Sequence, residues 1–402
     1  MLKNSRFIGG ILLVAGTAIG AGMLAIPVIT SFAGLFPSLA LLAFVWVFLY
    51  ITARLLLDAN LACPGEPNFI SMVGRTLGPL GKAICWVTYL LLLYSLTAAY
   101  IAGSAPFFQS VAWFLIGWKL PLWAEPLPLL CFFGLFTYLG TKPVDRINRL
   151  LMAGLILSYF LLISFLPSHT DASLFLHKDP IALCIAIPVV MTAFGFHIII
   201  PTLTTYLNHD ARKLRSVILI GSLIPFVVYV VWEFLILGTI PLVDLANAWQ
   251  KGESAVLPLV QVLQIPWISL VAQFFSFFAI VTSFLGVSLS LSDFLTDGLK
   301  IRKYSFGREI ASLLTFVPPL VFVYAYPRGF LLALEYAGIF VAILLCIFPA
   351  LMVWKLPKYR SFSRRTLLCS IILISFFVIG LSILEAGGAL QSLVARYVPT
   401  KV

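Results

Sequence analysis

Charged residues are scarce in this chain. Only 10% of its 402 residues are Asp, Glu, Lys or Arg, and it has only 4 His. A soluble globular domain carries about a quarter charged residues. So little charge, together with 61% hydrophobic residues and a mean hydropathy of +1.08, excludes that class. No segment alternates polar and apolar residues in the two-residue repeat of an outer-membrane barrel. The composition therefore predicts an all-α integral membrane protein.

The sequence also lacks the motifs that carry enzyme chemistry. It has no Gly-rich phosphate loop, no His-Glu-x-x-His and no clustered aspartates. Its six cysteines have no metal-ligand spacing and indicate no exported disulfide framework. We therefore predict that the protein is not an enzyme and that it uses no cofactor and no bound metal.

Eleven apolar segments are each long enough to cross a bilayer, which takes about 20 residues. Their predicted bounds are 7–33, 36–58, 82–108, 122–140, 147–167, 181–205, 214–240, 267–295, 309–326, 330–353 and 366–386. If the N-terminus is cytoplasmic, 20 of the 26 Lys and Arg residues lie on the cytoplasmic side and 6 lie outside. This is the bias of the positive-inside rule. This excess of cytoplasmic cations explains the net charge of +11, because Lys and Arg on that side lie beside anionic lipids of the bilayer. No nucleic-acid partner is therefore predicted.

The first of these spans is irregular where a membrane helix should be regular. Residues 16–27 read GTAIGAGMLAIP, with three glycines and a proline. No water is present in lipid to satisfy broken backbone hydrogen bonds, so such a break is tolerated only beside a cavity or under other protein. A helix broken at mid-membrane frees N–H and C=O groups that can bind a charged or zwitterionic ligand. The span therefore predicts a transporter binding site.

The sixth span repeats this pattern. Thr17-Ala18-x-Gly20 in span 1 matches Thr192-Ala193-x-Gly195 in span 6, and a proline follows each glycine six or seven residues later. The second break comes five spans after the first, an odd number, so the two copies enter the membrane from opposite sides. Such inverted repeats are typical of secondary transporters, whose broken helices meet at a midplane site. We predict a 5+5 inverted repeat over 7–167 and 181–353 with an extra helix at 366–386, all within a single transmembrane domain over 1–402.

The two breaks supply the candidate substrate-binding groups. N–H groups that begin the second half of span 1 can bind a carboxylate, and freed carbonyls at both breaks can bind an α-ammonium. The alternative is that Gly and Pro only kink the helix or allow close packing. Three glycines within seven residues, echoed in span 6, favour the binding interpretation. The candidate residues are Thr17, Gly20, Ala21, Gly22, Thr192 and Gly195.

Phe194, Phe196 and His197 lie at the second break. Phenylalanine rings there would suit an aromatic ligand, because aromatic rings prefer offset or edge-on contacts. With 34 Phe in the chain, however, two at any one site also fit ordinary packing. Ionisable groups inside a membrane are usually functional, so His197 is a candidate for binding a substrate hydroxyl or carrying a proton. A neutral histidine that holds a backbone carbonyl is an equal alternative.

Two carboxylates lie deep within predicted spans. Glu233 is in span 7 and Glu335 is in span 10. A desolvated glutamate can exchange a proton near neutral pH, so each is a candidate proton-coupling residue. A structural hydrogen bond to a neighbouring span is the alternative for either residue, and one proton site is sufficient.

Several of these segments resemble the bacterial hydroxy/aromatic amino acid permease family over nearly the whole chain. The matching segments are residues 16–27, Phe194-Gly195-Phe196-His197 with Pro201, Trp232-Glu233 with Gly238 and Pro241, and residues 284–288 with Asp293-Phe294. The resemblance implies the LeuT-like fold with broken helices 1 and 6. It also implies a multi-pass protein of the bacterial inner membrane that imports aromatic amino acids together with protons.

The sequence therefore predicts a secondary active transporter for tyrosine, with tryptophan or phenylalanine as further substrates, driven by proton symport. A permease for another small amino acid such as serine is the alternative within the same class. A channel or receptor built on the same spans is the alternative from a different class.

Overall fold

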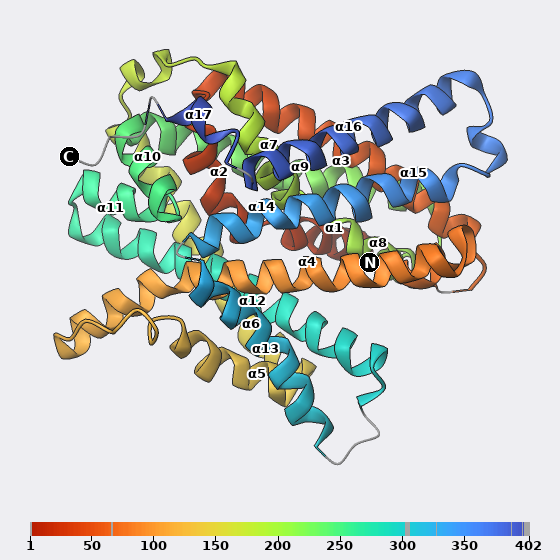
Figure 1. The fold of residues 1–402 in the computed structure, drawn as a ribbon, viewed down its shortest axis with the longest axis horizontal. Helices are drawn as coiled ribbons and strands as arrows, with labels where there is room; N and C mark the ends of the chain where they lie inside the picture. Colours follow the sequence, from red (N-terminus) through yellow and green to blue (C-terminus); the bar gives the residue numbers. More distant parts are fainter. Residues whose placement is uncertain are drawn as a thin grey trace.

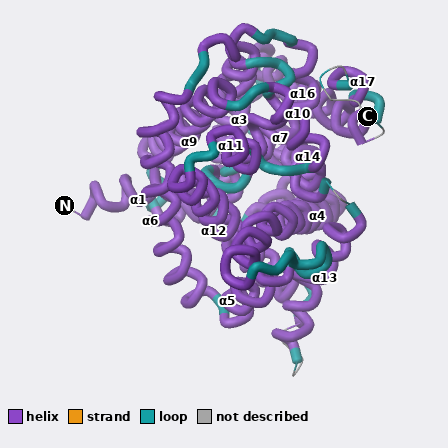
Figure 2. Tube along the Cα trace, turned by 90° about the vertical axis from the view of Figure 1, so that its left-hand side faces the viewer, coloured by secondary structure: helices purple, strands orange, loops and turns teal. Residues whose placement is uncertain are grey.

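The computed structural model describes residues 2–65, 67–301, 306–326, 328–386, 388–395 and 397, and within these ranges it contains helices and loops but no strand (Figure 2). The α-helices are α1 Leu2–Ala18, α2 Gly22–Thr30, α3 Leu35–Ala62, α4 Phe69–Ile116, α5 Gly134–Leu139, α6 Thr141–Phe165, α7 Leu183–Ala193, α8 Ile200–Tyr206, α9 Ala211–Thr239, α10 Leu242–Lys251, α11 Val256–Leu263, α12 Pro266–Gly298, α13 Gly307–Ala325, α14 Gly329–Val341, α15 Phe348–Val353, α16 Phe362–Ala386 and α17 Gln391–Val394. Short π-helices occupy η1 Leu129–Phe133 and η7 Ala342–Ile347, and short 3₁₀ helices occupy η2 Leu166–His169, η3 Ala172–Leu176, η4 Pro180–Ala182, η5 His197–Ile199 and η8 Pro357–Tyr359.

Among the described residues, nine helical segments are long and apolar enough to cross a membrane, and the bent pair α1–α2 makes a tenth. The segment expected at 122–140 is helical over Leu129–Leu139. At 1.5 Å per residue this helix is about 16 Å long, roughly half the hydrocarbon thickness of a bilayer. The all-helical class is therefore confirmed, while the count of eleven spans and the cytoplasmic N-terminus stay predictions.

Both expected irregular spans are interrupted. The axis bends by 51° between α1 and α2, and residues 194–199 separate the α-helical turns of α7 from those of α8. The first interruption lies at residues 19–21, around Gly20. The two prolines are not at the points of interruption, because Pro27 lies inside α2 and Pro201 lies in the first turn of α8.

The long helices pack around these interruptions. α1 lies along α9, α2 and α14 lie against α7, and α12 lies between α4 and α6. Figure 1 shows α4 and α14 running side by side across the molecule. The two interrupted spans thus pack against the long helices α3, α9 and α14.

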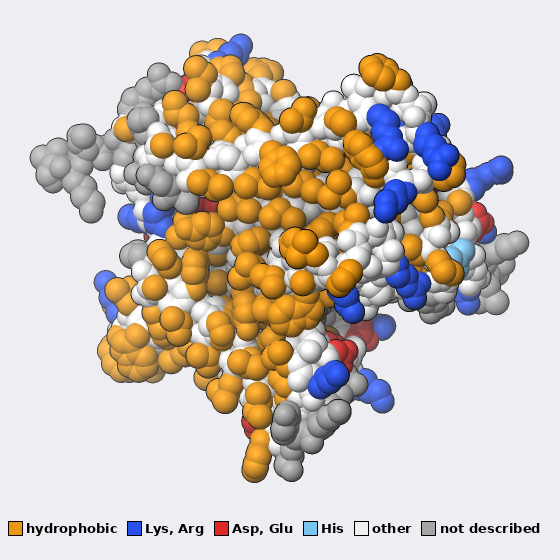
Figure 3. Space-filling view, turned by 45° about the vertical axis from the view of Figure 1, so that its right-hand side comes forward, with side chains coloured by type: hydrophobic (Ala, Val, Ile, Leu, Met, Phe, Trp, Pro, Cys, Tyr) orange, Lys and Arg blue, Asp and Glu red, His pale blue; other side chains and the backbone are white. Residues whose placement is uncertain are grey.

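The outer surface is strongly apolar. Large side chains such as Phe114, Leu122 and Phe160 are more than half exposed, which suits a protein whose solvent is lipid. Figure 3 shows a face covered by hydrophobic side chains, with Lys and Arg gathered mainly at its right-hand end. Residues 63–65 and the loop 354–361, both predicted to be cytoplasmic, lie toward the right in Figure 1.

Close packing of α14 on α7 gives a test of this arrangement. A Cβ atom on Gly338 of α14 would lie 2.6 Å from the backbone oxygen of Pro188 in α7, whereas a Cβ on Gly380 of α16 would meet open space. Overpacking costs about 1–3 kcal/mol. We expect Gly338→Ala to lower the melting temperature in detergent by several degrees. The control Gly380→Ala should leave it unchanged or slightly raised, and equal melting temperatures for the two variants would contradict this packing.

Candidate functional site

The two interruptions line one cavity of about 450 Å³, which we call the central cavity. Six of the residues predicted from the sequence line it, namely Thr17, Gly20, Ala21, Gly22, Thr192 and Gly195. Residues of α4, α6, α12 and α14 complete its walls. The volume lies within the range of small-molecule sites in proteins, which is about 300–1,000 Å³.

At the first interruption, the cavity receives the N-terminus of α2. The Ala21 N–H donates to Ser283 Oγ of α12 at 3.4 Å. The N–H groups of Gly20 and Gly22 have no acceptor in the described part of the chain. The N-terminus of a helix carries a partial positive charge and free donors. This end of α2 can therefore bind an anionic group such as a carboxylate.

The ends of α1 and α7 contribute the opposite charge. The last carbonyls of these helices, Ala18 O and Ala193 O, lie 2.6 Å and 3.0 Å from the hydroxyl of Tyr229 on α9. A tyrosine hydroxyl has one proton, so it can donate fully to only one carbonyl at a time. Two C-terminal helix ends with partial negative charge thus share a single donor. The site between them favours a cationic group such as an ammonium.

The hydroxyl of Thr192 connects the second interruption to α14. It lies 3.0 Å from Pro188 O and 3.2 Å from Leu334 O. Leu334 also lines the central cavity. The polar groups of α7 are therefore held against α14 as well as against α9.

The aromatic side chains in the cavity wall come from α4. Tyr89 and Tyr100 line the central cavity, whereas Phe194, Phe196 and His197 are buried outside its lining, each at most 1% exposed. Phe194 packs edge-on against Tyr229 at 4.9 Å between ring centroids. The predicted aromatic residues of span 6 thus pack behind the interruption in this conformation.

His197 contacts α3. Its Nε2 lies 2.8 Å from Thr52 Oγ1, and its Nδ1 is buried without a hydrogen-bond partner among the described residues. The ring therefore links η5 to α3 and does not reach the central cavity.

Glu233 is fully buried one turn beyond Tyr229 on α9. Its Oε1 lies 2.5 Å from Thr30 Oγ1 at the end of α2, and that hydroxyl is also 2.7 Å from Ile26 O. Because the Thr30 hydroxyl has one proton, it can donate to the carboxylate or to the carbonyl. If it donates to Ile26, a neutral Glu233 can donate its own proton to Thr30.

Glu335 lies on α14, next to Leu334 in the chain, and is 6% exposed. Its Oε1 has no hydrogen-bond partner in the described ranges. Arg328 and the carboxyl of Glu385 on α16 are near enough to interact with it electrostatically. The two predicted proton-coupling residues therefore lie at different places around the cavity, and neither lines it.

Sequence reasoning missed several residues of this site. Tyr100 and Tyr229 look like ordinary members of apolar spans, although the position of Tyr229 four residues before Glu233 places both on one face of α9. Ser283 is one of several serines in span 8, where serine commonly serves helix packing, yet it lines the cavity. Two other serines of α12 do not line the central cavity. Ser288 contacts Thr137 at 2.9 Å, and Ser292 lines a separate cavity beside α13.

Similarity to known proteins places this arrangement in a family. The profile of the Tryptophan/tyrosine permease family matches residues 3–386. The chain is 34% identical over 364 residues to Tyrosine-specific transport system 1 of Haemophilus influenzae, which covers 89% of this chain and 90% of that protein. It is 32% identical over 365 residues to the Tryptophan-specific transport protein of the same species, covering 87% of each.

A solved structure shares the fold. The crystal structure of MhsT in complex with L-phenylalanine matches with a TM-score of 0.62 at 14% identity, covering 94% of this chain and 98% of that one. This similarity supports the LeuT-like fold. The sequence relatives are bacterial transport proteins rather than enzymes, in keeping with a multi-pass protein of the inner membrane. The chain belongs to the Tryptophan/tyrosine permease family.

Proposed function

We propose that this protein imports an aromatic amino acid, tyrosine first and tryptophan or phenylalanine as further substrates, by proton symport. The observation that carries the proposal is the central cavity, which has free donors of α2 on one side and the carbonyl ends of α1 and α7 on the other. Such a pair of opposite charges matches the zwitterionic part of an amino acid. The relatives named as tryptophan-specific and tyrosine-specific support an aromatic side chain.

The substrate binds with its carboxylate at the N-terminus of α2 and its ammonium near the carbonyls of Ala18 and Ala193. Its ring lies against the α4 side of the cavity, where Tyr89 and Tyr100 provide aromatic surfaces. The glycines of α1 and α2 matter here because they let the backbone approach the ligand.

The conformation of this structure follows from the proposed orientation. The central cavity extends along α1 to the exposed residues Leu12 and Leu13. With a cytoplasmic N-terminus, this structure is therefore open toward the cytoplasm. The full proposal comprises eleven spans, with the inverted repeat over 7–167 and 181–353, and alternating access occurs around the two interruptions.

Glu233 and Glu335 are the proposed proton carriers. Glu233 contacts the far end of α2, the helix whose N-terminus binds the carboxylate. A change in its protonation changes which partner Thr30 donates to, and so links proton binding to the position of α2. The membrane potential adds about 2.3 kcal/mol per proton per 100 mV to inward movement.

Uptake into proteoliposomes tests the proposal. We expect saturable uptake of labelled tyrosine that is stimulated by an inward proton gradient and is inhibited by tryptophan and phenylalanine more than by the other amino acids. Inhibition mainly by serine would support a permease for small amino acids instead. Flux without saturation or counterflow would indicate a channel.

Substitution of the first glycine should block this uptake. A Cβ on Gly20 would collide with Ser283 Oγ, and a larger side chain would fill the central cavity. We expect Gly20→Leu to insert normally but to lose at least about nine-tenths of its uptake, a loss of about 1.4 kcal/mol or more in transport terms. Gly380→Ala is the control, and wild-type uptake by Gly20→Leu would remove the first interruption from the site.

Neutral variants of the two glutamates should separate binding from coupling. We expect Glu233→Gln or Glu335→Gln to keep counterflow of tyrosine but to lose accumulation driven by a proton gradient, because an amide cannot release a proton. Glu309→Gln, at an exposed position on α13, is the control. If both buried variants accumulate tyrosine as the wild type does, the coupling residue lies elsewhere.

The hydroxyl of Tyr229 is expected to hold the two interruptions together. Tyr229→Phe leaves the Ala18 and Ala193 carbonyls without their donor, and an unsatisfied buried polar group costs about 1–3 kcal/mol. We expect a lower melting temperature in detergent and slower uptake. Tyr206→Phe removes a hydroxyl from an exposed residue and serves as the control. The same behaviour in both variants would contradict a role for this hydroxyl.

A further inference from the structure

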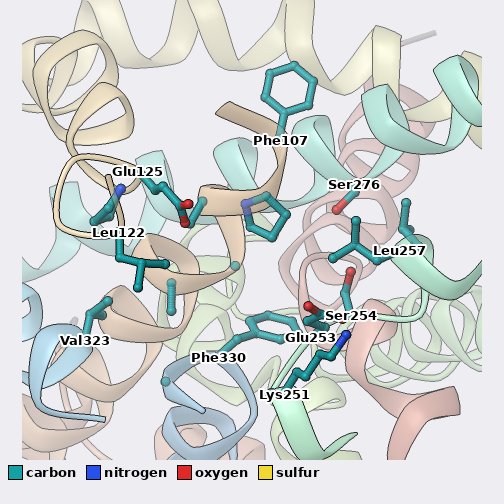
Figure 4. Close-up of a pocket in the computed structure, with 18 of the residues that line it drawn as sticks. Phe107, Leu122, Glu125, Lys251, Glu253, Ser254, Leu257, Ser276, Val323 and Phe330 are labelled. Carbon is teal, nitrogen blue, oxygen red and sulfur yellow. The ribbon is translucent and has the colours of Figure 1, made fainter. Parts of the chain in front are cut away.

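A second cavity of about 590 Å³, which we call the outer cavity, lies beyond the central one (Figure 4). It is formed by the C-terminal part of α4, the turn at residues 122–126, the connection between α10 and α11, the first half of α12, and the residues where α13 meets α14. In the proposed orientation these segments are at the external end of the molecule.

The two cavities follow the same three helices. On α4, residues 89–100 line the central cavity and residues 102–110 line the outer one. On α12, Ser276 lines the outer cavity and Thr282 the central one, a separation of six residues or about 9 Å. On α14, Phe330 lines the outer cavity, and Leu334, one turn later, lines the central one. The wall between the cavities is therefore thin.

Phe330 forms much of that wall. It is 2% exposed, and its ring packs on the backbone of α4 at Gly103, where a Cβ would lie 2.8 Å from Phe330 Cδ2 and 3.3 Å from Ile280 Cδ1. A ring that rests on a glycine meets no side chain there. A ligand in the outer cavity thus reaches the wall directly above the central cavity.

Charges of both signs face the outer cavity. Lys251 and Glu253 line it from the connection after α10, and Figure 4 shows both side chains near Phe330, with Glu125 on the opposite side. In the described chain neither Lys251 nor Glu253 forms an ion pair within 4.0 Å. Burial raises the pKa of the Glu253 carboxyl, and the charge of Lys251 opposes that rise.

The backbone that carries these two side chains has a defined conformation at the end of α10. Gly252 between them ends α10 with φ of 71°, in the left-handed region that glycine adopts readily. The Glu253 N–H then donates to Ala248 O at 2.8 Å. The neighbouring cation, Arg328, is engaged with Trp249, since its Nε donates to the Trp249 carbonyl at 3.2 Å and its guanidinium lies 4.2 Å from the ring centroid.

The rest of the lining is mainly apolar and aromatic. It includes Phe107, Leu122, Trp123, Tyr324 and Phe330. An anion and a cation two residues apart beside such a wall suit a zwitterion with an apolar or aromatic side chain. A ligand with a single charge would leave one of the two groups unmatched.

We propose that the outer cavity is a first binding site for the incoming amino acid. Glu253 binds the α-ammonium, Lys251 binds the α-carboxylate, and the side chain packs against Phe330. The ligand then passes the Phe330 wall to the central cavity. The identity of the ligand rests on the proposed function, whereas the existence of a separate outer site does not require that transport be driven by protons.

Charge reversal tests the assigned roles through uptake kinetics. Loss of one partly exposed ion pair corresponds to about a fivefold change in affinity. We expect Lys251→Glu or Glu253→Lys to raise the KM for labelled tyrosine about fivefold with little change in kcat, and the double reversal to recover most of the loss. Lys119→Glu, an equal charge change at an exposed residue outside the lining, is the control. An unchanged KM in both single variants would overturn the proposal.

Cysteine protection separates the outer site from the central one. We expect Ser254→Cys in intact cells to react with a membrane-impermeant maleimide and to be protected by external tyrosine. The control, Ser168→Cys, lies at an exposed position of η2 and should react without protection. The wild-type chain, with its own cysteines, gives the background.

The same labelling in the Gly20→Leu background completes the test. Protection of Ser254→Cys should persist there although uptake is lost, because the outer cavity does not contain Gly20. Absence of protection in either background, or no labelling from outside, would overturn the outer site. Absence of tyrosine uptake by the wild type would instead overturn the proposed function, so the two failures are distinguishable.

Discussion

The structure depends on how the backbone polar groups freed by two helix interruptions are satisfied. In lipid these groups have no water, and an unsatisfied one is costly. Neighbouring helices supply some partners, including Ser283 for the Ala21 N–H and Tyr229 for the carbonyls of Ala18 and Ala193. The N–H groups of Gly20 and Gly22 are left facing a cavity. These unsatisfied N–H groups form part of the proposed site for the zwitterionic part of an amino acid.

The same constraint explains why continuous helices surround the interrupted ones. Irregular backbone is tolerated at membrane depth only under protein cover or beside a cavity. Accordingly, α9 and α14 pack against α1–α2 and α7–α8, and α4 and α12 face them across the central cavity. These four helices also carry the side chains that decide the chemistry. Tyr229 and Glu233 are one turn apart on α9, so the residue that contacts both interruptions and the proposed proton carrier lie on one face of the same helix.

The sequence predicted the location of both interruptions because Gly20 and Gly195 lie at them, whereas Pro27 and Pro201 lie within the helices that follow. Thr17, Gly20, Thr192 and Gly195 accordingly line the central cavity. It could not predict which ring faces the ligand, because Phe and Tyr are common in every span and only the helix rotation decides their direction. Tyr89 and Tyr100 face inward on α4, while Phe194 turns toward Tyr229. His197 was visible as an unusual residue, but its contact with Thr52 depends on a helix 145 residues away.

The two cavities also explain why charged side chains are scarce in this chain and why they line the outer cavity rather than the central one. A charged side chain at the centre of a membrane is expensive, and in the proposed binding mode the central cavity holds its ligand with helix ends and hydroxyls rather than with ions. The outer cavity borders the aqueous phase in the proposed orientation, where Lys251 and Glu253 can stay charged at little cost. A ligand that moves inward thus exchanges full charges for partial ones. The central site must compensate by fitting it more closely, and the backbone at Gly20 and Gly22 permits that close approach.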